Sequence, residues 1–261
     1  MNNIYVLADI HGSYKPIRNL IKNVNKKPET IIILGDAGFN FFFNYRDVKL
    51  KEKINSYKIP IFTIRGNHEE RPSVCIKKDP NDWHTEMFWN NKVYVENDYP
   101  YIKYALDCPT RYDIPIEKEK ILKTLVLPGA YSVDKYYRLA HNWSWFPKEQ
   151  CTEKERLYGT ILAQSTNWDL ILSHTCPAIY EPTDLFLPMT DQSTVDKTTE
   201  RWLGEIEYNL NYKLWLFGHY HSLRIYPKYE NKQIIMLFND TFFNLNDYFS
   251  NKDVYNCLTI I

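Results

Sequence analysis

The chain has 261 residues, 44% of them apolar, so it is long enough to bury a sizeable core. Lysine plus arginine and aspartate plus glutamate number 32 each, and this balance provides no global attraction to nucleic acid or to an anionic membrane. The amino terminus lacks the basic start and apolar stretch of a signal peptide, and no apolar run is long enough to cross a bilayer. We therefore predict a globular, cytoplasmic protein without a membrane segment.

The cysteines support the same compartment. They are odd in number, scattered and without CxxC spacing, which favours a reducing environment over a disulfide framework or a zinc knuckle. We find no repeat, low-complexity tract or linker in the sequence. The whole chain, residues 1–261, is therefore predicted to form a single domain.

The amino-terminal part alternates short apolar runs with amphipathic stretches. Residues 4–9 (IYVLAD) predict a strand, after which Ser13 can cap a helix that has Pro16 in its first turn. Residues 30–36 (TIIILGD) predict a second, β-branched strand, and residues 47–57 a polar helix. Residues 59–70 (IPIFTIRGNHEE) predict a third strand that ends in polar side chains.

The remainder continues this alternation after an irregular middle. Residues 71–124 have no clean period and predict surface loops and short strands, and residues 122–138 a strand followed by a turn. Thr152 with Glu155 forms a capping-box pattern for a helix that reaches about Gln164. A strand at 168–174, an amphipathic helix around Trp202 and a strand from Leu214 follow, and residues 234–238 and 257–261 predict antiparallel closing strands. The alternation indicates an α/β fold of sheets covered by helices.

Five of the predicted strands end in polar motifs of one chemical kind. Because loops at the carboxyl ends of parallel strands gather at one rim of the sheet, these side chains are expected to meet. Five of the seven histidines lie in the motifs, and only His84 and His141 lie outside. Each motif alone is more often a cap, a turn or a satisfied polar residue than a site, but the ordered set is not. The motifs are DIH (Asp9, His11), GD (Asp36), GNHE (Asn67, His68), SH (His174) and GHYH (His219, His221).

The donor set predicts a metal centre. Carboxylate, imidazole and amide ligands suit manganese, iron or zinc rather than calcium or a thiolate site. The ligands are too many for one metal. Two metals bridged by a carboxylate can hold both the attacking and the leaving oxygen of a phosphoryl transfer, and Asp36 on its glycine-led turn is the natural bridge.

The ordered set resembles the signature of the calcineurin-like metallophosphoesterase superfamily, which is D-x-H, GD, GNH[DE], a strand-end histidine and GHxH. All five blocks are present between Asp9 and His221, and the chain looks most like the small bacterial and phage-type members. The resemblance implies an α/β two-sheet αββα sandwich with two divalent metal ions, manganese first and iron or zinc as alternatives. It implies one metal set of Asp9, His11, Asp36 and His221 and another of Asp36, Asn67, His174 and His219.

The resemblance also implies a reaction. A metal-bridging hydroxide would attack a phosphodiester or phosphomonoester, and His68, free of metal, would donate a proton to the leaving oxygen. The substrate would be a small phosphoester, with a nucleotide as one candidate, and nucleic acid is not favoured as a partner. The alternative is a scaffold that keeps the fold without catalysis, but degenerate scaffolds usually lose His68 or a bridging ligand, and here all are present. A nuclease would call for a basic groove, which the charge balance does not favour.

The sequence departs from the protein phosphatases of the superfamily. Their GDxVDRG is replaced by GDAGFNF, with Phe39 and Asn40 in place of the second aspartate and the arginine. Asn40 is a candidate for contact with phosphate or water, or else it caps the turn. Arg65 either meets substrate phosphate or pairs with a structural carboxylate. Glu69 or Glu70 either orients His68 or lies exposed in a loop.

One further segment, residues 129–150, resembles a stretch found in small bacterial and phage-encoded members. Tyr131, Asp134 and Arg138 are candidates for substrate contact within it. Trp143 or Trp145 can stack on a base, although aromatic clusters more often pack in a core. Tyr131 and Arg138 therefore join Asn40 and Arg65 as the predicted substrate-binding residues.

Overall fold

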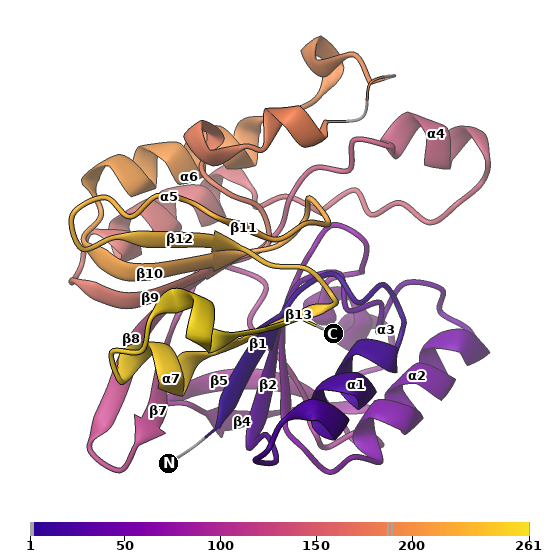
Figure 1. Cartoon of the computed structure of the whole chain (residues 1–261). Coiled ribbons are helices and arrows are strands. Elements are labelled where there is room, and N and C mark those ends of the chain that lie inside the picture. The colour runs from indigo at the N-terminus through magenta and orange to yellow at the C-terminus, as the bar shows by residue number, and fades with distance from the viewer. Residues whose placement is uncertain (1–2, 187, 189, 261) are drawn as a thin grey trace.

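The computed structural model describes residues 3–186, 188 and 190–260. Two β-sheets pack face to face, and helices cover both outer faces (Figure 1). Helices α1 (Lys15–Asn23) and α2 (Tyr45–Asn55) cover one sheet, and α5 (Glu153–Ala163) and α6 (Thr198–Asn209) cover the other. The predicted αββα sandwich is confirmed.

The first sheet has eight strands in the order β14-β13-β1-β2-β3-β6-β5-β4. Its central strands β1, β2, β3 and β6 are mutually parallel, and the other pairs are antiparallel. The strands are β1 (Ile4–Leu7), β2 (Thr30–Leu34), β3 (Ile61–Ile64), β4 (Trp83–Phe88), β5 (Asn91–Glu96), β6 (Ile102–Tyr104), β13 (Thr241–Asn244) and β14 (Leu258–Ile260).

The second sheet has six strands in the order β11-β12-β10-β9-β8-β7. Strands β8, β9, β10 and β12 are parallel, and the edge pairs are antiparallel. The strands are β7 (Thr110–Glu117), β8 (Lys120–Leu127), β9 (Trp168–Ser173), β10 (Tyr212–Phe217), β11 (Arg224–Ile225) and β12 (Gln233–Met236). The remaining elements are α3 (Pro72–Lys78), α4 (Lys135–Ala140), α7 (Leu245–Phe249) and the 3₁₀ turns η1 (Ala178–Tyr180), η2 (Thr183–Leu185), η3 (Gln192–Thr194) and η4 (Val254–Cys257).

The central strands are buried on both faces, which explains their continuous apolar runs. In β2, Ile32 and Leu34 belong to the core between the two sheets, whereas Ile31 and Ile33 pack beneath α1 and α2. A third cluster packs α5 and α6 on the second sheet. Because side chains alternate across a strand, an unbroken apolar run supplies both cores at once. The rigid parallel strands can then deliver their carboxyl-terminal loops to one rim.

The middle of the chain forms short strands as predicted, but the expectation that this region lies on the surface was wrong. Strand β7 alternates buried and half-buried residues, and its Tyr112, Ile114 and Ile116 lie in the core between the sheets. Val93 and Val95 of β5 lie there too. The residues of β7 alternate polar and apolar side chains with the period of a half-buried strand, so the sequence did carry a signal for this strand.

Smaller differences concern element ends. Helix α1 begins at Lys15 after Tyr14, and Ser13 does not occupy the N-cap position, although Pro16 is in the first turn as predicted. Strand β12 pairs antiparallel to β11 as predicted but parallel to β10, and β14 pairs antiparallel to β13 as predicted. The last residue of the predicted closing strand, Ile261, lies outside the described residues. The Thr152–Glu155 capping box is confirmed.

Candidate active site

The polar motifs meet where the parallel strands of both sheets end. Strands β1, β2 and β3 are followed by the DIH, GD and GNHE motifs, and β9 and β10 by the SH and GHYH motifs. Five of the seven predicted metal ligands have a left-handed backbone, which non-glycine residues seldom adopt and which clusters at functional sites. Their φ angles are 55° for Asp9, 43° for His11, 52° for Asp36, 71° for His219 and 53° for His221.

Two motif glycines are required because side chains of the site fill the space beside them. A Cβ on Gly35 would collide with the ring of His174, and a Cβ on Gly218 would collide with the carboxylate of Asp9. The glycines therefore permit the loops of the two sheets to approach this closely, and they explain why GD and GHYH carry glycine next to a ligand.

One half of the site is formed by two imidazoles and Asp36. The Nε2 atoms of His11 and His221 lie 2.8 Å apart, and Nε2 of His11 lies 4.0 Å from Oδ2 of Asp36. Asp9, His11 and His221 form one group whose possible ligand atoms all lie within 4.8 Å of one another. Asp36 with His11 and His68 forms a second such group.

The other half is centred on His174. Its Nδ1 donates to the carbonyl oxygen of Leu34 at 2.7 Å, so in the neutral ring Nε2 carries a lone pair. That Nε2 faces Oδ1 of Asn67 at 2.8 Å and Oδ2 of Asp36 at 3.5 Å. Asp9, Asp36 and His174 form the third group of possible ligands. The ring of His219 lies 5.0 Å from that of His174, centroid to centroid.

The charges of the site favour a cation. Burial and the neighbouring imidazoles keep His219 and His221 neutral by lowering their pKa values, and burial lowers the pKa of His11 to about 4. Burial opposes ionisation of Asp36, but His174 and His68 hold its pKa well below the usual range. Burial also disfavours a charged His174, yet Asp36 and Asp9 raise its pKa to about 9. The ionised carboxylate of Asp36 and its neighbours therefore attract positive charge to the space beside His174.

These residues fit two divalent cations. Neutral imidazoles and an ionised carboxylate are the protonation states that metal binding needs. Nitrogen faces nitrogen at His11 and His221, so a cation between the two rings would satisfy both. At His174 the neighbouring carboxylates hold a second proton on the ring, facing Asn67 and Asp36, and a bound cation would take the place of that proton. Burial raises the pKa of Asp9 well above its usual range, so this carboxyl also gains from a nearby positive charge.

His68 lies beside the ligands and contacts a residue from the α4 segment. Its backbone N–H donates to Oδ1 of Asp36 at 2.8 Å, and its ring faces Nη2 of Arg138 at 3.1 and 3.2 Å. Arg138 is buried and pairs with Asp134 at 2.7 Å. Burial is the main cause that lowers the pKa of His68; Asp36 opposes it and Arg138 adds to it. The guanidinium therefore places a positive charge directly beside the ring of His68.

Sequence reasoning missed a buried network of hydrogen bonds that holds the side chain of Asn67. Its Nδ2 donates to Oγ of Ser132 at 2.9 Å, and that hydroxyl donates to Oε2 of Glu149 at 2.6 Å. The Ser132 N–H donates to the same carboxylate at 3.0 Å. This network orients the Asn67 amide so that its oxygen faces His174. Ser132 follows β8, another parallel strand, and that position was the available signal.

Other candidates lie away from the ligands. Asn40 accepts from Lys51, and Arg65 donates to the carbonyl oxygens of Lys148 and Glu149, not to a carboxylate. Both line a separate cavity of about 10 Å³. Both residues thus have hydrogen-bond partners within the protein, and their contact with substrate stays a prediction. Glu69 is buried, not exposed, and accepts from the N–H of Gly66 instead of orienting His68.

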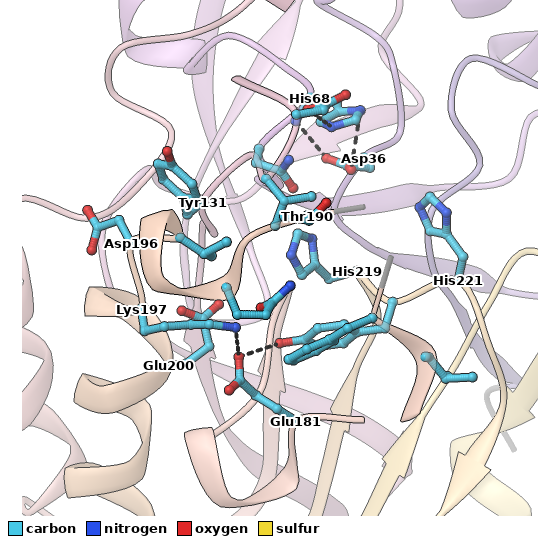
Figure 2. A pocket seen from close by; sticks show the side chains of 18 residues that line it. Asp36, His68, Tyr131, Glu181, Thr190, Asp196, Lys197, Glu200, His219 and His221 are labelled. Carbon is cyan, nitrogen blue, oxygen red and sulfur yellow. Dashed lines mark hydrogen bonds and ion pairs between the residues drawn. The ribbon is translucent and has the colours of Figure 1, made fainter. Parts of the chain in front are cut away.

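The larger cavity opens at the predicted ligands. It has a volume of about 240 Å³, and Asp36, His68 and Tyr131 line it together with residues from the segment 181–200. Figure 2 shows Asp36, His68, His219 and His221 at one end and Glu181, Lys197 and Glu200 at the other.

Trp143 is 56% exposed beside Tyr137, so the expectation that this tryptophan packs in the core was wrong.

The fold and its family match define a metallophosphoesterase, a hydrolase of phosphoric ester bonds. The chain belongs to the calcineurin-like phosphoesterase family, whose model matches residues 3–223. The family is dinuclear and metal-dependent, and the three groups of possible ligands agree with that character.

A solved structure of low identity shares the fold. TT1561 of Thermus thermophilus is 11% identical, has a TM-score of 0.53 and covers 99% of this chain and 98% of its own. Two further structures match with lower scores. A dimetal phosphatase from Danio rerio is 11% identical with a TM-score of 0.48, covering 94% of this chain and 95% of its own. A 5'-nucleotidase from Candida albicans is 13% identical with a TM-score of 0.45, covering 98% of this chain and 50% of its own.

Comparison with curated proteins found no match. No helix in the described ranges is both long and apolar enough to span a membrane.

Proposed function

We propose that this protein hydrolyses a small phosphomonoester or phosphodiester with the help of two divalent cations. The observation that carries the proposal is the convergence of Asp36 with four imidazoles and the Asn67 amide, delivered from five strands of two sheets. A nucleotide is one substrate of suitable size.

We also propose a cytoplasmic location, because all five cysteines have free thiols.

The proposed ligands divide into two sets that share Asp36. Asp9, His11, Asp36 and His221 would hold one cation, and Asp36, Asn67, His174 and His219 the other. When bound, the cations supply Lewis-acid activation of water and of the phosphoryl oxygens. Manganese is the proposed ion, with iron or zinc as alternatives, because the donors mix oxygen and nitrogen without thiolate.

The chain itself contributes a proton and a charge. His68 is proposed to donate a ring N–H proton to the leaving oxygen as water adds to phosphorus and the ester P–O bond breaks. A monoester then gives an alcohol and inorganic phosphate, and a diester gives an alcohol and a phosphomonoester. Arg138, in contact with the His68 ring, is proposed to bind a phosphoryl oxygen. Tyr131 lines the cavity close to these residues and is proposed to contact the substrate.

The proposal is tested by hydrolysis of bis(p-nitrophenyl) phosphate and p-nitrophenyl phosphate by manganese-loaded protein. We expect cleavage that Asp36→Asn abolishes, because the bridging carboxylate is lost. Asp98→Asn, which alters an exposed aspartate, is the matched control and is expected to retain the wild-type rate. The ratio of the two rates distinguishes a diesterase from a monoesterase.

Failure of the metal-loaded wild type on both esters and on a panel of natural phosphoesters would overturn the proposal. It would favour the alternative, a scaffold that keeps the fold without catalysis. Binding of two cations by that inactive protein would then show that the metal centre is present without catalytic activity.

A further inference from the structure

The end of the cavity remote from the predicted ligands is lined by described residues that lie between Glu181 and Glu200 in the sequence. The cavity volume of about 240 Å³ lies below the range of roughly 300–1,000 Å³ that is usual for drug-sized ligands. The space beyond the metal ligands therefore suits the alcohol portion of a small phosphoester. What that portion can be depends on the polar groups that line the cavity.

Glu200 is a lining residue whose hydrogen bonding is incomplete. It lies in the first turn of α6, is 3% exposed, and its Oε1 accepts from Oγ1 of Thr175 at 2.8 Å. Its Oε2 is buried and has no hydrogen-bond partner among the described residues. Leaving a buried carboxylate oxygen unpaired costs free energy. Because Glu200 lines the cavity, a hydrogen-bond donor on a molecule bound there would stabilise this oxygen.

The charges around Glu200 restrict that molecule. Lys197 is the one lysine or arginine among the lining residues that the structure describes, and its Nζ is paired with Glu181 at 2.6 Å. Asp196 and Glu200 add further carboxylates to the lining. An anionic group would meet net negative charge here, so the alcohol portion is expected to be uncharged.

The same end also offers an apolar surface. The rings of Phe186 and Tyr220 stack at 6.2 Å between centroids with an interplanar angle of 23°, and both line the cavity with Leu185 and Val195. A flat or apolar group can pack against them while a polar edge reaches Glu200.

We propose that Glu200 determines the substrate specificity of this protein. Its free carboxylate oxygen accepts a hydrogen bond from a hydroxyl or amino group on an uncharged alcohol portion that also has an apolar face, the chemistry of a nucleoside. This inference rests on the proposed phosphoesterase function, which places the phosphoryl group at the other end of the cavity.

The test is run at about pH 8, where Glu200 is ionised, and compares adenosine 5'-monophosphate, which carries such donors, with phenyl phosphate, which does not. In Glu200→Gln the amide oxygen stays with Thr175 and the amide nitrogen replaces the acceptor. We therefore expect the ratio of kcat/KM for the two esters to fall about tenfold. Glu205→Gln alters an exposed glutamate of the same helix and is expected to keep the wild-type ratio. In the wild type, 4-carboxyphenyl phosphate is expected to react more slowly than phenyl phosphate.

A second readout does not depend on activity. Calorimetric titration of adenosine into metal-free protein is expected to show about tenfold weaker binding to Glu200→Gln than to the wild type or to Glu205→Gln. Thermal unfolding checks that the variant is folded. Equal kcat/KM ratios in wild type and Glu200→Gln, or adenosine binding that is absent or unchanged by the substitution, would overturn the inference. If the wild type hydrolysed neither ester, the proposed function would fail, and the adenosine titration alone would decide the role of Glu200.

Discussion

The Nε2 atoms of His11 and His221 lie 2.8 Å apart although 210 positions separate the residues in sequence. Low pKa values keep both rings neutral, so at most one of the facing nitrogens carries a proton. Each residue also holds a left-handed backbone that costs on the order of 1–3 kcal/mol. A structure that retains this strain to place two imidazoles against each other is suited to hold a shared cation between two sheets.

Removal of one of these rings is expected to remove one cation. His221→Ala should reduce the manganese bound at saturation from about two ions to about one per chain, because the set around His174 remains complete. Equilibrium dialysis with elemental analysis measures the stoichiometry. His141→Ala, on an exposed histidine outside the site, should still bind two. A His221→Ala protein that bound two ions with wild-type affinity would exclude His221 as a ligand.

The Ser132 hydroxyl is expected to tune metal affinity through Asn67. Ser132→Ala leaves the Asn67 amide free to turn, and we expect manganese affinity to fall about 10- to 100-fold, the usual loss when a supporting hydrogen bond is removed. Titration with a competing chelator measures it. Ser165→Ala, on an exposed serine, is the control. Affinity unchanged by Ser132→Ala would show that Asn67 keeps its orientation without this partner.

Arg138 is expected to act on turnover more than on folding. Arg138→Met should lower kcat for p-nitrophenyl phosphate about 100-fold, the scale seen when one donor to a developing charge is lost. Because the guanidinium contributes to the lowered pKa of His68, its removal should also move the basic limb of the kcat profile to higher pH. A pH profile that kept its shape in Arg138→Met would contradict the coupling between the two residues. Arg46→Met, on an exposed arginine, controls for loss of charge.

Glu200 is expected to make stability depend on pH. Burial raises its pKa from 4.5 to about 7 in the folded protein, so the folded state binds the extra proton between these values. Stability should therefore fall as pH rises from 4.5 to 7, by about 3 kcal/mol for this group. Glu200→Gln should exceed the wild type in unfolding free energy at about pH 8 and match it at about pH 4.5. Urea unfolding of metal-free protein at both values measures this, and equal differences at the two values would contradict it.

The strand-end motifs could be predicted because their placement is a local matter. An apolar run such as Ile31–Leu34 must be a buried strand, and the residues that follow it must leave the sheet at its carboxyl end. Parallel strands bring those ends to one rim within each sheet. Asp36 and His174 follow strands of different sheets, so the sequence assigned them to one site through the ordered set of motifs, and the packing of the two sheets brings them into contact.

Tertiary packing decided the contacts that no local pattern records. Ser132 reaches Asn67 and Arg138 reaches His68 because the segment after β8 folds back across the rim of the other sheet. Glu200 faces the cavity because α6 begins there, and a glutamate in a first helical turn is ordinarily a solvated charge.

The sequence by itself therefore determined the strands, their order of polar endings and the chemistry those endings offer, because backbone period and residue type are local properties. The tertiary structure alone decided which groups surround them and which candidates, such as Asn40 and Arg65, turn to structural partners. The physical reason is that burial and hydrogen-bond satisfaction are settled between segments far apart in the chain.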